Sequence, residues 1–253
     1  MNEAGPRVDL LGCRFDAYRL PDAVEQVARW VAGDALRQGV GVNVDHLVKM
    51  DRDPAFAAQV LQADMILADG MPVVWASRAL SRPLPERLPA IDLFDALLPR
   101  AAREGWPIYL LGARLEVVQE AADRLREAHP GLVIAGLHDG YFDDEGPWQA
   151  IADSGAKLLF LGMSSPKKEA FVSTHRHRLG DVRFVLGVGG AFDIAAGRAT
   201  RAPAWMGRAG LEWAFRLAQE PRRMGRRYLW EDLRFLGILW RSRRGGGTTG
   251  RRA

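Results

Sequence analysis

Short apolar segments alternate with amphipathic segments along most of the chain. Brief uninterrupted apolar runs are typical of strands buried on both faces of a parallel sheet. Six such runs lie at residues 40–44, 65–70, 107–113, 132–140, 156–163 and 183–193. Between them, apolar residues recur at helical spacing, for instance over residues 91–103 and 115–129. The alternation predicts a Rossmann-like α/β body, with helices on both faces of a mostly parallel sheet. Residues 8–20 alternate around Gly12, which predicts a hairpin or an edge strand.

The pattern changes in the last quarter of the chain. From about residue 202, apolar and aromatic side chains at helical spacing predict one helix, which Pro221 ends. A second apolar stretch follows over residues 228–240, interleaved with arginines. We therefore expect two domains, an α/β body at residues 1–197 and a helical basic appendage at residues 198–253.

The charge divides between the same two parts. The whole chain has a net charge of +4, but from Arg198 onward it holds fourteen arginines, no lysine and four acids, a local net of +10. The body is therefore left with −6. The low-complexity end from about residue 241 is predicted to be disordered. So basic an appendage indicates an anionic partner, such as nucleic acid, a membrane surface or a phosphorylated substrate.

Aromatic residues among the arginines favour one of these partners. Basic side chains interleaved with tryptophan and leucine at helical spacing are typical of amphipathic helices at an anionic membrane surface. Ordinary helices that pack their apolar sides on the body remain the alternative. Nucleic acid is disfavoured, because the body has no basic stripe and no nucleic-acid-binding motif.

Several classes of protein are excluded by composition. The single cysteine, Cys13, excludes a disulfide framework and any cysteine-based zinc cluster. The acidic start does not read as a signal peptide, and no apolar stretch approaches the ~18 residues of a membrane span. We expect a cytoplasmic protein.

Candidate chemistry lies where the predicted strands end, because ligands of open α/β sheets bind beyond the carboxyl ends of the strands. Asp69 ends one apolar run and can serve as a general base, or can cap the next helix, which has Pro72 in its first turn. The glycine-rich residues 187–193 can offer backbone N–H groups to phosphates. Lys167 and Lys168 begin another helix and can bind a diphosphate, or can simply be solvated.

Two motifs that could hold a metal are better explained otherwise. Asp51 and Asp53 form a DxD pattern, but Pro54 follows, so Asp53 is interpreted as a helix cap. His175 and His177 are two residues apart, which places them on different sides of a helix. No metal site and no cofactor are predicted.

The segments that carry this chemistry resemble a known family. These are ILADGMPVVWASRALSRPLPERLPAIDLFDALL at 66–98, LHDGYF at 137–142, LGMSSPKKEAFV at 161–172, GVGGAFDIAAGRATRAPAWMGRAGLEWAFRL at 187–217 and QEPRRMGRRYL at 219–229. In order and spacing they resemble the WecG/TagA/CpsF family of bacterial glycosyltransferases, glycosyltransferase family 26, over roughly residues 8–240.

The resemblance implies a function. Family members transfer a sugar, with inversion and without a bound metal, from a UDP-sugar to a saccharide on undecaprenyl diphosphate at the inner face of the plasma membrane. This reaction belongs to cell-surface polysaccharide synthesis, and it implies a peripheral membrane protein.

The resemblance also implies roles for particular residues. Asp69 falls on the catalytic base and Asn43 on a nucleotide-side asparagine. Arg87 falls on the arginine of the PLPER stretch, which can assist the leaving diphosphate of the UDP-sugar. The resemblance also implies substrate binding at Gly189, Gly190 and Asp193, and Lys168 is a further substrate-binding candidate from its place at the start of a helix. The appendage arginines implied to meet the lipid diphosphate or the membrane are Arg216, Arg222, Arg223, Arg226 and Arg227.

The chain departs from the family pattern at two positions. Gly41 stands where many members have threonine, and Lys168 stands where many have glutamine. The donor sugar therefore stays open between N-acetylmannosamine, another hexose and a uronic acid. The alternative function is a non-enzymatic Rossmann-like nucleotide binder that docks on nucleic acid or an acidic partner through its arginines.

Overall fold

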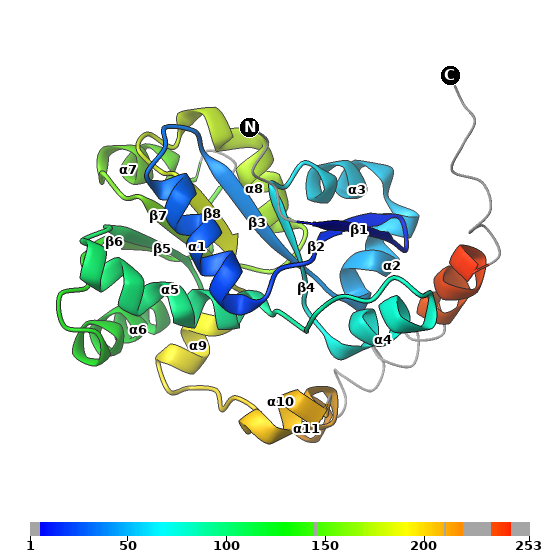
Figure 1. Cartoon of the computed structure of the whole chain (residues 1–253). Helices are drawn as coiled ribbons and strands as arrows, with labels where there is room; N and C mark the ends of the chain where they lie inside the picture. Colours follow the sequence, from blue (N-terminus) through cyan, green and yellow to red (C-terminus); the bar gives the residue numbers. More distant parts are fainter. Residues whose placement is uncertain (1–5, 144–145, 210, 220–233, 244–253) are drawn as a thin grey trace.

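The computed structural model describes residues 6–143, 146–209, 211–219 and 234–243 (Figure 1). At its centre is a six-stranded sheet in which every pair is parallel, in the order β4-β3-β8-β7-β5-β6. The strands are β3 (Arg37–Val42), β4 (Met65–Ala68), β5 (Ile108–Gly112), β6 (Ile134–His138), β7 (Leu158–Gly162) and β8 (Phe184–Gly187). Each contains or overlaps one predicted apolar run, so the strand predictions and the fold class are confirmed.

Helices cover both faces of this sheet, as the apolar runs require (Figure 1). One face packs against α1 (Leu20–Val31), α5 (Ala90–Glu104), α6 (Leu115–Ala128) and α9 (Ala191–Ala195). The other face packs against α2 (Val44–Arg52), α3 (Pro54–Leu61), α4 (Met71–Ala79), α7 (Trp148–Asp153) and α8 (Lys167–His175), and the 3-10 turn η1 (Arg176–Arg178) follows α8. Alternate residues of one strand serve the two faces: Met65 and Leu67 pack on the first, Ile66 and Ala68 on the second.

The predicted hairpin forms and protects an edge of the sheet. Its strands β1 (Arg7–Leu10) and β2 (Cys13–Asp16) pair antiparallel around Leu11 and Gly12. Both turn residues have positive φ, 56° and 75°, which is typical of two-residue hairpin turns. Asp16 accepts a hydrogen bond of 2.8 Å from the N–H of Ile66 in the edge strand β4. The hairpin thereby occupies a backbone donor that would otherwise be open to another chain.

The appendage begins with two short helices rather than the single helix predicted over residues 205–217. The structure has α10 (Ala204–Ala209) and α11 (Glu212–Gln219). The N–H of Leu211 donates to the carbonyl of Met206 at 2.8 Å, a bond that closes helix C-termini. The prediction of a continuous helix was wrong because the spacing of apolar residues alone does not reveal a short break between two helices.

Residues 234–243 form a further helix, drawn in red in Figure 1. Phe235 and Ile238 are buried in the core beside α2, α3 and α4, and Arg241 bonds both carboxylate oxygens of Asp51 at 2.7 and 2.8 Å. Residues 241–243, which the sequence predicted to be disordered, are therefore helical, because the apolar side of this helix packs on the body. No helix of the described residues is long and apolar enough to cross a membrane.

Five predicted appendage residues cannot be placed. Arg222, Arg223, Arg226 and Arg227 lie outside the described residues, as does the side chain of Arg216. The assignment of these arginines to the lipid diphosphate or the membrane stays a prediction.

Candidate active site

Four neighbouring strands carry most of the predicted site at their carboxyl ends. In sheet order, Asp69 follows β4, Asn43 follows β3, Gly189 and Gly190 follow β8, and Lys168 lies after β7. The parallel topology therefore brings these residues, which are far apart in sequence, to one edge of the sheet. That edge is where open α/β sheets bind their ligands.

Asp69 is held at the end of β4 by both neighbouring segments. Its N–H donates to the carbonyl of Val42 at 3.0 Å, one residue beyond the end of the strand. The N-cap residue of α4 is Gly70 rather than Asp69. A Cβ at Gly41 would lie 2.9 Å from Asp69 Oδ2. The half-buried carboxylate therefore occupies the space that a side chain on β3 would take.

Asn43 lies beside this loop and begins the next helix. Its Oδ1 accepts a hydrogen bond of 3.2 Å from the N–H of His46 and lies 2.9 Å from His46 Nδ1. Asn43 Cβ is 3.8 Å from the place that a Cβ of Gly70 would take. The amide and the Asp69–Gly70 loop therefore share the edge of the sheet.

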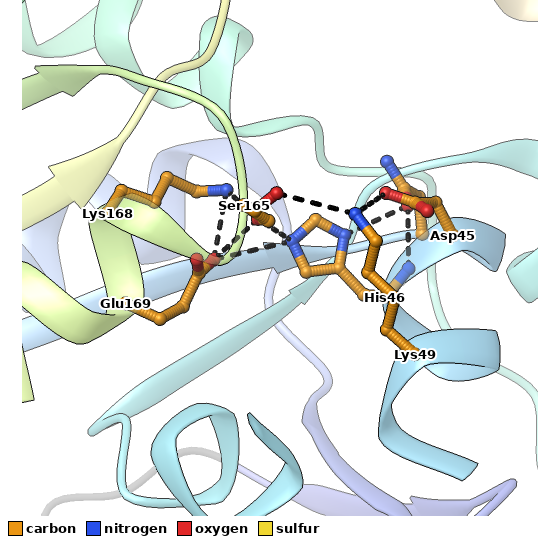
Figure 2. A network of polar contacts seen from close by, with 7 residues as sticks. Asp45, His46, Lys49, Ser165, Lys168 and Glu169 are labelled. Atoms are coloured by element: carbon orange, nitrogen blue, oxygen red, sulfur yellow. Dashed lines mark hydrogen bonds and ion pairs between the residues drawn. The ribbon is translucent and has the colours of Figure 1, made fainter. Parts of the chain in front are cut away.

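Lys168 is not solvated but buried in a network of polar contacts, shown in Figure 2. Its aliphatic stem crosses Gly187 at the end of β8, where any Cβ would come within 2.6 Å of Lys168 Cε. Its ammonium donates to Glu169 Oε1 at 2.9 Å and to the hydroxyl of Ser165. Ser165 in turn donates to Glu169 at 2.8 Å and lies 3.0 Å from His46 Nε2.

This network controls the charge of Glu169. Burial raises the pKa of the carboxyl, but the hydrogen bond with His46 and the positive charge of Lys168 outweigh burial and bring the pKa from 4.5 to about 2. A carboxylate with a lowered pKa stabilises the folded state at pH values above 4.5. It loses that contribution as the pH falls toward 2.

We expect the free energy of unfolding of Glu169→Gln to fall less steeply than that of wild type as the pH is lowered. The shift corresponds to a pH-dependent free energy of unfolding on the order of 3 kcal/mol, all of it acquired between pH 2 and pH 4.5. Urea unfolding from pH 6 down to the lowest pH at which the protein stays folded measures the slope. Glu127→Gln removes an exposed carboxyl and should keep the wild-type slope. Equal slopes in Glu169→Gln and wild type below pH 4.5 would contradict the prediction.

The glycine-rich loop after β8 is open to solvent. Gly189 and Gly190 are exposed, and Gly189 adopts a positive φ of 54° with no neighbour near the place of a Cβ. Asp193 follows in α9, and its carbonyl accepts hydrogen bonds from the N–H groups of Arg198 and Ala199 at 2.8 and 3.0 Å. The loop leaves room for a ligand to approach the backbone closely, and Asp193 joins it to the start of the appendage.

Arg87 lies in a groove between the body and the appendage. The groove has a volume of about 640 Å³. It is lined by Leu20, Met71, Val74, Arg78, Pro85, Glu86, Arg87, Leu88, Asp92, Arg201, Ala202 and Gly207. Its residue Leu88 donates its N–H to the carbonyl of Ala68 at 2.9 Å, immediately before Asp69, and Met71 follows Asp69 by two residues. The groove therefore adjoins the loop that carries Asp69.

Asp92 lies between two arginines of this groove. Its Oδ2 is 3.8 Å from Arg87, and its Oδ1 bonds Arg201, which also reaches Asp95 at 3.0 Å. Arg87 packs against α10, where a Cβ on Gly207 would lie 3.1 Å from its guanidinium. Both guanidinium groups are thus fixed where the appendage meets α5.

Comparison with known proteins shows the family of the chain. The glycosyl transferase WecG/TagA/CpsF family matches residues 8–248, almost the entire chain. The chain belongs to this family. It is therefore a glycosyltransferase, as the sequence resemblance implied.

One relative of known description is a protein of Bacillus spizizenii strain W23. It is named N-acetylglucosaminyldiphosphoundecaprenol N-acetyl-beta-D-mannosaminyltransferase. The two sequences are 35% identical over 176 residues, which cover 69% of this chain and 68% of the relative.

The DxD pattern of this glycosyltransferase is structural. Asp53 accepts hydrogen bonds from the N–H groups of Ala55 and Phe56 at 2.9 and 3.2 Å, which confirms that it caps α3. Asp51 pairs with Arg241. Within the described part of the chain, no three side chains of histidine, cysteine, aspartate and glutamate gather as metal ligands would.

Sequence reasoning missed four residues around the site. His46, Ser165 and Glu169 complete the network of Lys168, and Arg201 completes the groove. Only the place of His46, three residues after a helix-capping asparagine, carries a local signal. The others become visible only when α8 and the appendage pack on the body.

Proposed function

We propose that this glycosyltransferase moves a sugar from a UDP-sugar to a saccharide carried on undecaprenyl diphosphate, with inversion, in cell-surface polysaccharide synthesis. The position of Asp69 supports this most directly. Asp69 follows β4 at the edge of the sheet that also carries the exposed glycine loop, and its own loop adjoins a groove that carries arginines. The name of the Bacillus relative supports N-acetylglucosaminyl diphosphoundecaprenol as acceptor. N-acetylmannosamine is the first donor sugar to test, followed by other hexoses and uronic acids.

In the proposed reaction, Asp69 is the general base. It takes the proton from an acceptor hydroxyl while that oxygen forms a bond to the anomeric carbon of the donor. The bond from this carbon to the phosphate oxygen breaks, and UDP leaves with the electron pair. The proton stays on Asp69 until solvent removes it. A single displacement of this kind inverts the anomeric configuration.

Charge that develops on the leaving diphosphate needs fixed hydrogen-bond donors. The exposed backbone of Gly189 and Gly190 can supply them, and Asn43 adds an amide beside the Asp69 loop. The ammonium of Lys168 pairs with Glu169, and its aliphatic stem packs on Gly187 at the end of β8. We therefore propose that Lys168 supports the edge of the sheet. We propose that catalysis proceeds on these donors without a metal.

The groove suits the lipid-linked acceptor. Arg78, Arg87 and Arg201 can meet a diphosphate, for which planar guanidinium groups are well matched. Met71, Val74 and Leu88 give it an apolar floor that suits the first part of a polyprenyl chain. The groove adjoins Asp69, so a saccharide on that diphosphate can present its hydroxyl to the base.

We propose that the enzyme works as a peripheral protein on the inner face of the plasma membrane. In the helix at residues 234–243, Phe235 and Ile238 pack on the body, whereas Leu236 and Trp240 are 58% and 54% exposed. These two lie four residues apart, on one side of the helix. An exposed tryptophan–leucine pair within a strongly basic appendage suits an anionic lipid surface.

We expect the double variant Leu236→Ser, Trp240→Ser to bind vesicles at least about tenfold more weakly, since each side chain loses apolar surface that would enter the interface. Sedimentation with phosphatidylglycerol–phosphatidylethanolamine vesicles measures the binding. Leu115→Ser removes an exposed leucine of α6 in the body and should bind like wild type. Unchanged sedimentation of the double variant would contradict the assignment.

The function is tested by assaying UDP release from a panel of UDP-sugars, with and without a short-chain polyprenyl-diphosphate N-acetylglucosamine acceptor. We expect acceptor-dependent UDP release from one member of the panel, with UDP-N-acetylmannosamine the first candidate. Acceptor-independent hydrolysis alone, or no release from any UDP-sugar, would overturn the proposal.

A further inference from the structure

The backbone N–H of His46 identifies which terminal atom of the Asn43 amide is the oxygen. The backbone N–H of His46 lies 3.2 Å from one terminal atom of the amide, so that atom must be the acceptor oxygen. His46 Nδ1 lies 2.9 Å from the same oxygen and therefore carries a hydrogen. No hydrogen bond among the described residues uses the amino group of Asn43. Two N–H donors are thus left on a half-exposed side chain at the edge of the sheet.

His46 is itself held from the opposite side. Its Nε2 lies 3.0 Å from Ser165 Oγ and 3.5 Å from Glu169 Oε1, both contributed by the segment after β7 (Figure 2). Glu169 and Lys168 also bond each other, so the ring contacts a buried set of groups that cannot rotate independently. With contacts at both nitrogens, the imidazole has one orientation.

The His46 ring is nearly closed to solvent. Its side chain is 8% exposed and packs beside Phe56 of α3, with ring centroids 6.1 Å apart. Whatever His46 contributes to the reaction has to pass through the residues it contacts.

We infer that His46 is a positioning residue that turns the amino group of Asn43 toward the UDP-sugar. The atom of the UDP-sugar that binds there is consequently an oxygen that accepts a hydrogen bond from the amino group. This inference rests on the proposed function, because it takes the UDP-sugar as the ligand at the edge. It adds a second layer to the site, in which α8 fixes an amide on α2 through one imidazole.

The inference predicts a change in donor affinity without a change in turnover. Removing one well-placed donor to a charged or polar oxygen costs about tenfold in affinity. His46→Ala should therefore raise the KM for the UDP-sugar about tenfold and leave kcat within about twofold. His46→Asn places an amide nitrogen where Nδ1 stands, so it should restore most of the wild-type KM. His177→Ala removes an exposed histidine of η1 and should change neither constant.

A double-mutant cycle distinguishes positioning from simple stabilisation. If His46 acts through Asn43, His46→Ala should have no further effect on KM in an Asn43→Ala background. Asn43→Asp keeps both acceptor bonds to His46 and a good helix cap, but it offers no donor, so it should bind the UDP-sugar at least as weakly as Asn43→Ala. Additive effects, or a His46→Ala variant that loses melting temperature but keeps its KM, would overturn the inference.

Calorimetric titration of the UDP-sugar separates this inference from the function itself. The dissociation constants of wild type, His46→Ala and His46→Asn can be compared without any turnover. A wild type that binds the UDP-sugar but does not transfer would overturn the proposed reaction, and the three dissociation constants would still decide the role of His46. Equal dissociation constants in all three proteins would overturn the positioning role.

Discussion

Asp69→Asn is expected to lower kcat by about 10²–10⁴-fold, the usual contribution of a general base. The amide has nearly the same shape as the carboxylate but cannot accept the proton of the acceptor hydroxyl. Because the N-cap residue of α4 is Gly70 and asparagine has nearly the shape of aspartate, the melting temperature should stay close to that of wild type. Steady-state kinetics with saturating donor and acceptor measure the effect.

The matched control is Asp123→Asn, which changes an exposed aspartate of α6 and should leave kcat unchanged. The KM values of Asp69→Asn should stay within a few-fold of wild type, because its loss is confined to proton transfer. Near-normal turnover in a folded Asp69→Asn variant would contradict the assignment of the base.

Arg87→Ala is expected to raise the KM for the lipid-diphosphate acceptor on the order of 10- to 100-fold, since hydrogen bonds to charged groups contribute more than neutral ones. Asp92 keeps its ion pair with Arg201, so the substitution does not leave this carboxylate unpaired. The KM for the UDP-sugar should change little. Initial rates at varied acceptor and saturating donor measure the effect.

Two further variants sharpen this experiment. Arg87→Lys keeps the charge but loses the planar fork, and it should give an intermediate acceptor KM. Arg103→Ala removes an exposed arginine of α5 and should behave like wild type. If Arg87→Ala raised the donor KM and left the acceptor KM unchanged, the groove would belong to the donor.

Gly41 leaves to the Asp69 carboxylate the space that a side chain on β3 would take. With a Cβ at this position only 2.9 Å from Asp69 Oδ2, any side chain there has to displace the carboxylate. Glycine lets the base lie directly against β3. The glycine at position 41 therefore determines where the Asp69 carboxylate can lie.

The strands and the edge that holds the site could be predicted from the sequence because both follow from local pattern. Buried parallel strands are apolar throughout, so each run marked its own strand, and the residue after each run marked the edge. Asp69 and the glycines at 187–190 were found at the ends of such runs, and Asn43 was found through the family resemblance. The alternating segment around Gly12 likewise indicated its hairpin before any partner was known.

The second layer of the site could not be predicted because it depends on tertiary pairing. Ser165 and His46 are separated by 119 positions, and no local pattern links them. Lys168 reads as a surface lysine until α8 packs on β8 and buries its stem over Gly187. Arg201 lies in a segment without helical or strand pattern, and only the fold brings it to Asp92.

Inverting transfer by a single displacement is tested most directly by the anomeric configuration of the product. Proton NMR of the reaction of an α-linked UDP-sugar with the polyprenyl-diphosphate acceptor should show one new β-linked sugar for each UDP released. This product should be lost in Asp69→Asn and kept in Asp123→Asn. An α-linked product, or UDP release without a new glycosidic bond, would contradict direct attack by a hydroxyl that Asp69 deprotonates.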